Sequence, residues 1–376
     1  MRIARLLWLP LAAATFFIHA QAPAQAPAPA RPTAAKEQMT IEDYEPKTVL
    51  VVPEHHPTRA KFPFIDVHTH HRDTSQKAVA ILQKDMDAMN MQIMVNSPVN
   101  GSWGDKTKEL IDGFRTFNKD RFVTFTNINF KGIGEPDWAS KTAAQLETDI
   151  KNGAVGLKVW KNFGLTEKDI DGKRVAVDDA RLDAIWDTCA KYKIPVLIHT
   201  ADPKPLFQPM DKNNERWLEL KLQPNRGSQT ISWDQLIGEQ HNLIRRHPKT
   251  NFIAAHLGWM SHDLDAMGKL LDEMPNFHVD IAAILGEIGR QPRQARKFFI
   301  KYQNRILFGK DRYDPAEYGF YFRILETEDE YFDNIRKYHG LWKLYGLALP
   351  DETLKHIYYK NALRLVPGLK SSGFPR

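Results

Sequence analysis

The sequence predicts an α/β fold, a (β/α)8 barrel of the TIM type, and three observations lead to this prediction. Short apolar runs, each able to form a buried strand, alternate from residue 60 onward with longer amphipathic stretches of helical period. There are eight such runs, the number that closes a barrel of parallel strands joined by helical crossovers. Several runs also stop on a histidine or an aspartate, and a barrel would gather these side chains at one mouth. An open, doubly wound sheet is the alternative, and it would spread them along a line.

The individual elements follow from these runs and from the periodic stretches between them. The expected strands begin near Phe64, Met91, Arg121, Gly153, Ile194, Thr250, Asn276 and Arg305. The expected helices cover residues 76–89, 106–118, 140–151, 178–192, 232–246, 262–273 and 291–303. Because each strand is followed by a helical stretch, all strands are expected to run parallel.

Two regions exceed a minimal barrel and predict a distorted one. Residues 201–230, after the fifth strand, are rich in proline and aromatic residues and show few regular signals. A loop of this length on the catalytic face is expected to form a lid or a substrate wall. After the eighth strand, helical patterns near residues 331–345 and 352–365 predict extra C-terminal helices.

The N-terminal residues predict an exported protein. In residues 1–20, Arg2 and Arg5 precede an apolar stretch too short to span a bilayer, and small residues follow, with cleavage favoured after Ala20. A retained membrane anchor is the alternative. Residues 21–46 begin as a proline- and alanine-rich tract, which predicts an extended linker, and residues 47–376 are expected to form a single barrel domain. We expect a periplasmic or secreted protein without stable membrane insertion after cleavage.

Charge and cysteine content exclude some classes of function. The chain has 52 basic and 46 acidic residues, and removing residues 1–20 takes away two arginines and leaves 50 against 46. This excess is small and scattered, which argues against a nucleic-acid partner. The single cysteine, Cys189, excludes an intramolecular disulfide and lies in a helical pattern typical of a buried structural thiol. We expect a small-molecule substrate as the partner, and the sequence leaves a homodimer open.

Histidines and an aspartate at the ends of four strands are the candidate metal ligands. His68 and His70 end the first strand and point to the same side, because residues i and i+2 of a strand share a face. The fifth and sixth strands end on His199 and His256, and the eighth ends on Asp311. The eighth strand neighbours the first in a closed barrel, so Asp311 can complete a set of three histidines and one aspartate. Taken singly, each of the last three is more often an ordinary histidine or a turn carboxylate.

These motifs resemble those of the amidohydrolase superfamily. The matching runs are Ile65-Asp66-Val67-His68-Thr69-His70, Ile198-His199, Ala255-His256-Leu257-Gly258 and Ile306-Leu307-Phe308-Gly309-Lys310-Asp311. The chain looks most similar to the amidohydrolase-related branch, which contains aminocarboxymuconate-semialdehyde and resorcylate decarboxylases beside lactone and amide hydrolases. The resemblance implies that one divalent metal ion, usually Zn²⁺, is bound by His68, His70, His199 and Asp311. It also implies that His256 stands beside the metal-bound water as an acid or base.

Lys158 leaves two types of metal site open. It lies in the fourth strand, where binuclear members of the superfamily carry a carbamylated lysine that bridges two metals, with His199 and His256 then on the second ion. We favour a mononuclear site, in which Lys158 is an ammonium group available to a substrate carboxylate. A lysine that extends out of the barrel beyond Trp160 is the structural alternative.

Three aromatic residues are candidate walls of a substrate site. Trp160, Trp259 and Tyr313 follow the fourth, sixth and eighth strands. Their rings would surround the mouth of a barrel, which is consistent with a planar or ring-shaped substrate. Packing of the same rings under loops is the alternative.

The expected activity follows from the metal ion. A bound divalent metal lowers the pKa of water from about 16 towards about 7 and polarises a carbonyl oxygen. A neutral His256 can accept or return the proton. We therefore expect a hydrolase that acts on an amide, ester or lactone carbonyl of a small substrate, aromatic or carboxylate-bearing. Decarboxylation of an unsaturated or aromatic acid with the same ligands is the alternative. A non-catalytic binding protein is the third hypothesis, and the intact ligand residues argue against it.

Overall fold

The structure, a computed structural model, describes residues 39–227 and 229–375. The expected signal peptide, residues 1–20, lies outside the described residues, as does most of the expected linker; residues 39–46 are described and exposed. The chain divides into the units Met1–Val51 and Val52–Arg376, and the second holds every strand named below. Within the described ranges, the structure has no helix that is both long and apolar enough to cross a membrane.

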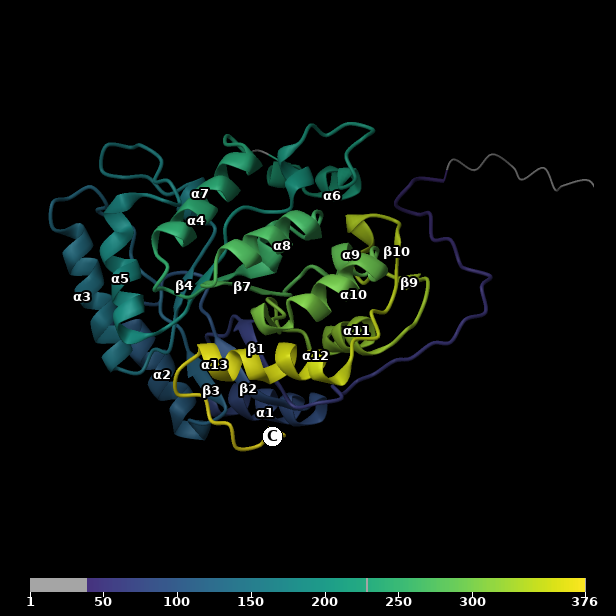
Figure 1. Cartoon of the computed structure of the whole chain (residues 1–376), viewed down its shortest axis with the longest axis horizontal. Coiled ribbons are helices and arrows are strands. Elements are labelled where there is room, and N and C mark those ends of the chain that lie inside the picture. The colour runs from purple at the N-terminus through teal and green to yellow at the C-terminus, as the bar shows by residue number, and fades with distance from the viewer. Residues whose placement is uncertain (1–38, 228, 376) are drawn as a thin grey trace, which may run out of the picture. The chain divides into compact units, whose positions relative to one another are not determined.

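Eight parallel strands form the centre of the Val52–Arg376 unit, and the order of strands and helices along the chain is the predicted one (Figure 1). One sheet has the order β1-β2-β3 and the other β4-β5-β6-β7-β8. The strands are β1 (Phe64–Thr69), β2 (Met91–Asn96), β3 (Phe122–Thr124), β4 (Leu157–Val159), β5 (Val196–Ile198), β6 (Phe252–Ala254), β7 (Phe277–Asp280) and β8 (Ile306–Leu307). The fold is therefore an α/β fold of the (β/α)8 type.

Isolated bridges, rather than continuous ladders, span the two seams between these sheets. At the β3–β4 seam, the main-chain N–H of Lys158 donates to the carbonyl of Thr126 at 2.8 Å. At the β8–β1 seam, the N–H of Asp311 donates to the carbonyl of His68 at 2.7 Å. The second seam therefore joins the ends of the two strands that carry the predicted ligands, and the barrel is distorted as expected.

The long helices pack around the strands and lie within a few residues of their predicted positions. They are α1 (Gln76–Met89), α2 (Asp105–Asn118), α3 (Trp138–Lys151), α5 (Asp183–Tyr192), α7 (Trp233–Arg246), α8 (Leu264–Glu273) and α10 (Pro292–Lys301). Ser75 and Ser232 cap α1 and α7, because each side chain accepts the main-chain N–H of the residue three positions further along the chain. Cys189 is buried in α5, as predicted.

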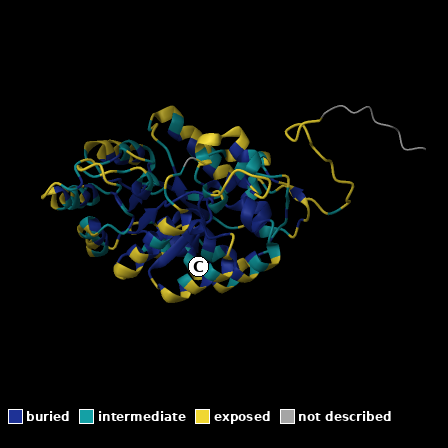
Figure 2. Cartoon of the chain, turned by 90° about the horizontal axis from the view of Figure 1, so that it is seen from above, coloured by how far each residue is buried: buried dark blue, intermediate teal, exposed yellow. Residues whose placement is uncertain are grey.

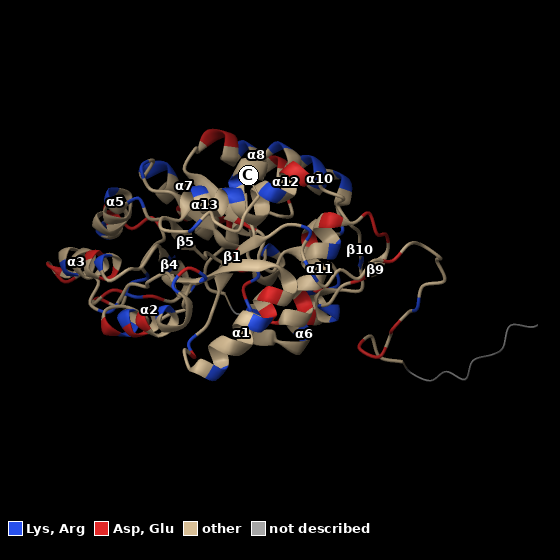
Figure 3. Cartoon of the chain, turned by 90° about the horizontal axis from the view of Figure 1, so that it is seen from below, with Lys and Arg blue, Asp and Glu red and all other residues tan. Residues whose placement is uncertain are grey.

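Burial explains why the strands are apolar along their whole length. Helices cover the outer face of the strands, so side chains on both faces are removed from water. Figure 2 shows the strands as buried and the outward faces of the helices as exposed. On the surface, Lys and Arg are mixed with Asp and Glu along helices such as α2, in keeping with the nearly balanced composition (Figure 3).

The insertion after β5 forms an irregular segment, as the sequence predicts. Its regular parts are a short α6 (Trp217–Leu222) and two 3-10 turns at Lys204–Phe207 and Pro224–Gly227. Two further short helices follow strands, α4 (Asn162–Leu165) after β4 and α9 (Leu285–Ile288) after β7. These segments lie between the strand ends and the longer helices, where loops of a barrel shape the active site.

The predicted helix at residues 331–345 is wrong. This stretch forms an antiparallel pair, β9 (Phe332–Asp333) with β10 (Lys343–Leu344). Two local features oppose a helix: Asn334 accepts the N–H of Arg336 with its own side chain, and a Cβ on Gly340 would meet the Trp342 ring at 2.2 Å. The C-terminal helix is confirmed as α12 (Asp351–Lys355), a π-helical turn at His356–Lys360 and α13 (Asn361–Leu365). An unpredicted helix, α11 (Pro315–Glu326), begins at a proline. Asp314 caps this helix by accepting the main-chain N–H of Ala316.

An aromatic cluster packs the β8–β1 seam against the C-terminal helices. The ring of Phe64 in β1 lies 4.8 Å from that of Phe308, 5.6 Å from that of Phe322 in α11 and 6.0 Å from that of Tyr358, measured between centroids. The N–H of Phe308 donates to the carbonyl of Ile357 at 2.9 Å, so the chain after β8 bonds to the C-terminal segment. Apolar burial therefore holds the seam where the strand ladder is sparse.

Asp66 ties the same seam together from inside. Its Oδ1 accepts the main-chain N–H of His68 at 2.9 Å and that of Lys310 at 3.2 Å, and its Oδ2 accepts the hydroxyl of Tyr318 at 2.7 Å. Burial raises the pKa of Asp66 to about 7, although these hydrogen bonds lower it. Asp66 is therefore a capping group for main-chain N–H groups at this seam.

We expect replacement of Tyr318 by Phe to lower the free energy of unfolding by about 1–3 kcal/mol, because it leaves a buried carboxyl oxygen without its donor. Tyr313→Phe is the matched control, since its hydroxyl donates at 3.2 Å to the partly exposed Asp85 and should contribute less than about 0.5 kcal/mol. Chemical denaturation measures both values. Equal losses in the two variants would contradict the role assigned to Asp66.

Candidate metal centre

The centre is built outward from the end of β1, where His68 has a fixed orientation. Its Nδ1 donates to the Oδ2 of Asp280 at 2.7 Å, and the ring is fully buried. Because a carboxylate only accepts, the proton of the neutral ring lies on Nδ1, and Nε2 presents a lone pair. Burial, together with the charge of the nearby Lys158 ammonium, lowers the pKa of His68 to about 3. The imidazole is therefore neutral, the form that binds a metal.

Asp280, at the end of β7, was missed by the sequence analysis. Besides His68, it accepts the main-chain N–H of His256 at 2.7 Å and that of Ala282 at 3.0 Å, all through buried atoms. Burial acts to raise the pKa of Asp280, but His68 and these donors hold it below its usual value. The signal was available, because the apolar run Phe277–Asp280 also stops on a ligand-type residue.

His70 and Asp311 place two further acceptors beside His68. The Nδ1 of His70 donates to the carbonyl of Ser97, so the Nε2 of the neutral ring carries a lone pair, and this atom lies 2.8 Å from the Oδ1 of Asp311. The same oxygen lies 3.7 Å from the Nε2 of His68. Burial acts to raise the pKa of Asp311, but the surrounding histidines hold it well below its usual range. One ligand atom from each of the three residues lies within 4.8 Å of the others.

His256 lies on a left-handed turn at the end of β6. Residues 256–259 all have positive φ, at 60°, 53°, 57° and 55°. Asp280 holds the N–H of His256, and the ring Nδ1 donates to the carbonyl of Ala282 at 2.8 Å. The Nε2 therefore carries a lone pair, is buried and has no hydrogen-bond partner. The ring stacks on Trp259, with centroids 4.5 Å apart.

His199, at the end of β5, lies beside His256 rather than within the group formed by His68, His70 and Asp311. Its ring centroid is 4.4 Å from that of His256 and 5.0 Å from that of Trp160. Both ring nitrogens are buried without a hydrogen-bond partner. Burial, with the charges of its neighbours, holds the pKa of His199 well below its usual value, so this ring is neutral as well. Its predicted role as the fourth ligand stays a prediction.

The side chain of Lys158 points into the centre and does not extend out of the barrel. It is 1% exposed, and its Nζ lies 3.0 Å from the Nε2 of His68. Burial lowers the pKa of Lys158 to about 8, although Asp280 and Asp311 oppose this. This position next to the ligands is compatible with either the mononuclear or the binuclear alternative.

The donor set fits a divalent metal ion. The lone pairs of His68 and His70 face the carboxylate of Asp311, an arrangement of acceptors that a shared cation stabilises. Two further imidazoles, those of His199 and His256, have buried nitrogens without a hydrogen-bond partner beside this group. Imidazole nitrogens together with a carboxylate oxygen form a ligand set typical of zinc and of other first-row metals.

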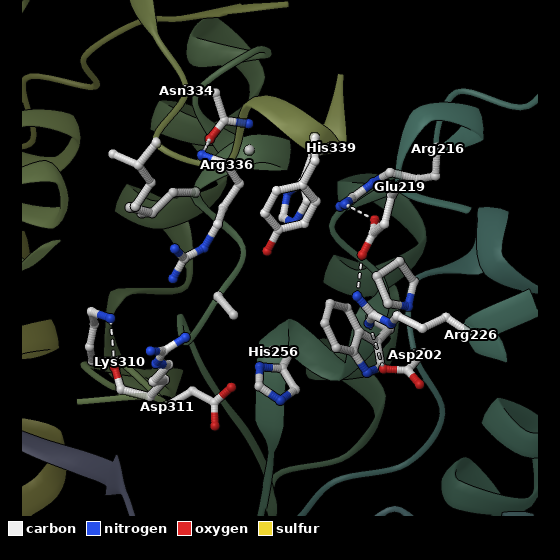
Figure 4. Close-up of a pocket in the computed structure, with 18 of the residues that line it drawn as sticks. Asp202, Arg216, Glu219, Arg226, His256, Lys310, Asp311, Asn334, Arg336 and His339 are labelled. Carbon is white, nitrogen blue, oxygen red and sulfur yellow. Dashed lines mark hydrogen bonds and ion pairs between the residues drawn. The ribbon is translucent and has the colours of Figure 1, made fainter. Parts of the chain in front are cut away.

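A cavity of about 270 Å³ opens above the centre. His199, His256 and Asp311 lie at one end of its lining, and Figure 4 shows His256 and Asp311 together there. Trp160 and Trp259 line the cavity, as predicted. Tyr313 is not among the lining residues: its ring packs on His71, 4.8 Å away between centroids, so the alternative of packing under a loop applies to it. Nor does Lys158 line the cavity, because it lies below, against His68.

The insertion after β5 forms one wall of the cavity and neutralises its own charges. Asp202 pairs with Lys161 at 2.6 Å and with Arg226 at 3.3 Å. Arg226 and the fully buried Arg216 both pair with Glu219, the second at 2.7 Å. Residues of the segment 201–230 therefore line the cavity, and the lid or substrate wall expected there stays a prediction. Figure 4 shows these ion pairs along one side of the cavity.

The opposite wall carries an excess of positive charge. Lys310 and Arg336 share one carboxylate, Glu317, at 2.5 Å and 2.8 Å. Arg312, exposed at the mouth, adds a further guanidinium group. Two of these cations share a single negative charge, so an anionic group of a ligand would be favoured on this side.

Comparisons with known proteins agree with this geometry. A family model described as "Amidohydrolase" matches residues 65–368, which include all the residues of the centre. The TIM-barrel protein Bb4693 from Bordetella bronchiseptica is 14% identical with a TM-score of 0.52, over 81% of this chain and 98% of that one. A dihydroxybenzoic acid decarboxylase from Polaromonas sp. JS666, solved with manganese and 2-nitroresorcinol, is 13% identical with a TM-score of 0.52, over 81% and 96%. At such identities these two likenesses show the fold alone. No curated protein sequence matches the chain.

Asp280→Asn should weaken metal binding about 10–100-fold, because it removes the charge that orients His68. His68→Ala should abolish binding of an ion that otherwise reaches about one per chain. Elemental analysis and competition with a chelator measure both effects. Asp149→Asn is the matched control, a buried carboxylate that bonds Thr126 and Gly104 away from the centre, and it should leave metal affinity unchanged. Wild-type affinity in Asp280→Asn would show that Asp280 does not orient the ligand.

Proposed function

The chain belongs to the amidohydrolase family of enzymes, and from this premise we propose that it hydrolyses the amide, ester or lactone carbonyl of a small, carboxylate-bearing substrate. One divalent metal ion would be held by His68, His70, Asp311 and His199, and we propose zinc as that ion. When bound, such an ion supplies Lewis acidity towards a carbonyl oxygen and towards water.

The observation that carries this proposal is the state of His256. Its Nδ1–H is bonded to a carbonyl, that of Ala282, and its Nε2 lone pair has no partner although it lines the cavity. A water molecule that attacks a carbonyl must lose a proton, and an unprotonated Nε2 beside the centre can accept it. The same atom can then return the proton to the leaving group. Decarboxylation needs instead a proton donor at carbon, and a His256 ring whose one proton is on Nδ1, bonded to Ala282, has none to donate from Nε2.

The walls of the cavity account for the substrate class. Trp160 and Trp259 flank the ligand residues and provide apolar faces that exclude water and fit a planar group. Lys310, Arg312 and Arg336 supply the positive side described above. Together these features favour a compact, flat substrate that carries a negative charge.

A panel of lactones, esters and amides with a carboxylate group, incubated with the metal-loaded protein, should release acid without carbon dioxide. Acid release is followed by titration and carbon dioxide separately, with His68→Ala protein as the inactive control. Release of carbon dioxide from aromatic or unsaturated acids, without hydrolysis of any member of the panel, would replace our proposal with the decarboxylase.

His256→Asn should reduce turnover about 10²–10⁴-fold while metal content stays near that of the wild type, because Asn cannot accept the proton. His199→Asn should remove metal and activity together, and this pair separates a proton acceptor from a ligand. Steady-state kinetics and elemental analysis of the same preparations give the comparison. If His256→Asn lost metal as completely as His199→Asn, the binuclear site with Lys158 as bridge would take the place of the mononuclear one.

A further inference from the structure

At the end of the cavity away from the metal centre, three nitrogen atoms converge on Gly286. A methyl group placed on Gly286 would lie 3.2 Å from the Nδ2 of Asn334, 3.7 Å from the Nδ1 of His339 and 3.8 Å from the Nε1 of Trp342. All three nitrogens are buried and have no hydrogen-bond partner. Figure 4 shows Asn334 and His339 across the cavity from His256 and Asp311.

These atoms form a set of hydrogen-bond donors. The Oδ1 of Asn334 accepts the N–H of Arg336 at 3.0 Å, which fixes the amide with its NH₂ group free, and the residue is only 5% exposed. The indole N–H of Trp342 can only donate. The Nδ1 of His339 can complete the set as a third donor. Unpaired buried donors are rare in proteins, and in a cavity they are satisfied by water or by a ligand that accepts hydrogen bonds.

Arginines surround the donor set. Arg216 is 1% exposed and pairs with Glu219 and Glu287, its guanidinium lies 5.9 Å from the Trp342 ring centroid, and its Nε has no partner. Arg290, which pairs with Glu215, lies over the same ring at 4.2 Å. Burial lowers the pKa of His339 to about 2, with the charges of Arg216 and three other arginines adding to this, so the imidazole is neutral among cations. Glu287, which pairs with Arg216, also has an unpartnered oxygen. Neither Glu287 nor Trp342 is among the residues that line the cavity, whereas Asn334 and His339 are.

We propose that Asn334, His339 and Trp342 form a second recognition site, which binds a carboxylate of the substrate at the end away from the metal. This proposal rests on the proposed function only for the reaction that takes place at the other end of the substrate, at the metal centre. The substrate class is then a bifunctional acid, with the scissile carbonyl at the metal centre and a carboxylate held at Gly286. The ammonium of Lys158, predicted from the sequence to bind a substrate carboxylate, lies 3.0 Å from the Nε2 of His68 and is not among the residues that line the cavity.

Glycine at position 286 is part of this site because it leaves the point of convergence open. The residue lies in α9 with no strained backbone, so alanine is compatible with its conformation. A Cβ there would lie in tight contact with the Nδ2 of Asn334 and would occupy the place of the carboxylate. Gly286→Ala therefore blocks the site without touching a ligand residue.

Titration calorimetry of the metal-loaded protein with benzoate, and with benzamide as a neutral probe, tests the proposal. Gly286→Ala and Asn334→Leu should each weaken benzoate binding about 10–100-fold, the range expected for lost hydrogen bonds to a charged group, and change benzamide binding much less. Gly238→Ala in α7 is the matched control, since a Cβ there meets nothing within 4 Å, and it should bind benzoate as the wild type does. Metal content should be equal in all four proteins.

The results separate this site from the proposed reaction. Unchanged benzoate affinity in both variants, as binding at the metal alone would give, overturns the site whatever the protein hydrolyses. An equal loss for benzoate and benzamide overturns its selectivity for a carboxylate. Selective loss of benzoate binding supports the site even if no lactone, ester or amide of the panel is turned over, and in that case only the reaction is wrong.

Discussion

The buried carboxylate of Asp280 is the group on which the rest of the centre depends. It bonds a side chain at the end of β1, a main-chain N–H after β6 and another after β7, so three segments of the barrel are set relative to one another by one group. By binding the Nδ1 of His68, Asp280 leaves the Nε2 of that ring facing the centre. By accepting the main-chain N–H of His256, it holds the turn that carries this histidine. A charge buried in this way is stable only because every bond it makes is to a donor.

From this constraint follows the electrostatic character of the site. The Nδ1 atoms of His68, His70 and His256 make the bonds that orient the three rings. Their Nε2 atoms are therefore the ones that face the centre, beside the carboxylate of Asp311. Acceptors that face each other in a buried environment repel unless a cation lies between them, and the buried ammonium of Lys158 lies 3.0 Å from the Nε2 of His68. Chemistry and recognition are thus divided. The strand ends supply a metal site and, in the proposed function, a base, while the insertion and the β9–β10 segment supply charges and unpartnered nitrogens around the cavity.

Local patterns in the sequence were enough for the parts of the molecule that depend on local physics. Apolar runs and helical periodicity predict the strands and the long helices, and the residue that ends each strand predicts His68, His70, His199, His256 and Asp311 at one mouth. Asp280 ends the run Phe277–Asp280 in the same way, although the sequence analysis did not include it. Other features depend on contacts between distant residues. Three such features are the direction of Lys158, the packing of Tyr313 against His71 and the pairing of β9 with β10. Each depends on where other segments of the chain lie, and residue spacing within one segment gives no information on that.

The left-handed turn at 256–259 shows that this chain keeps function at the expense of stability. Three of its four residues, His256, Leu257 and Trp259, have side chains, and the left-handed conformation costs each of them roughly 1–2 kcal/mol. Glycine at position 257 would relieve part of this cost but would loosen the turn that holds the His256 ring stacked on Trp259. A sequence optimised for thermal stability alone would remove the strain, so a gain in melting temperature from this turn is expected to come with a loss of activity.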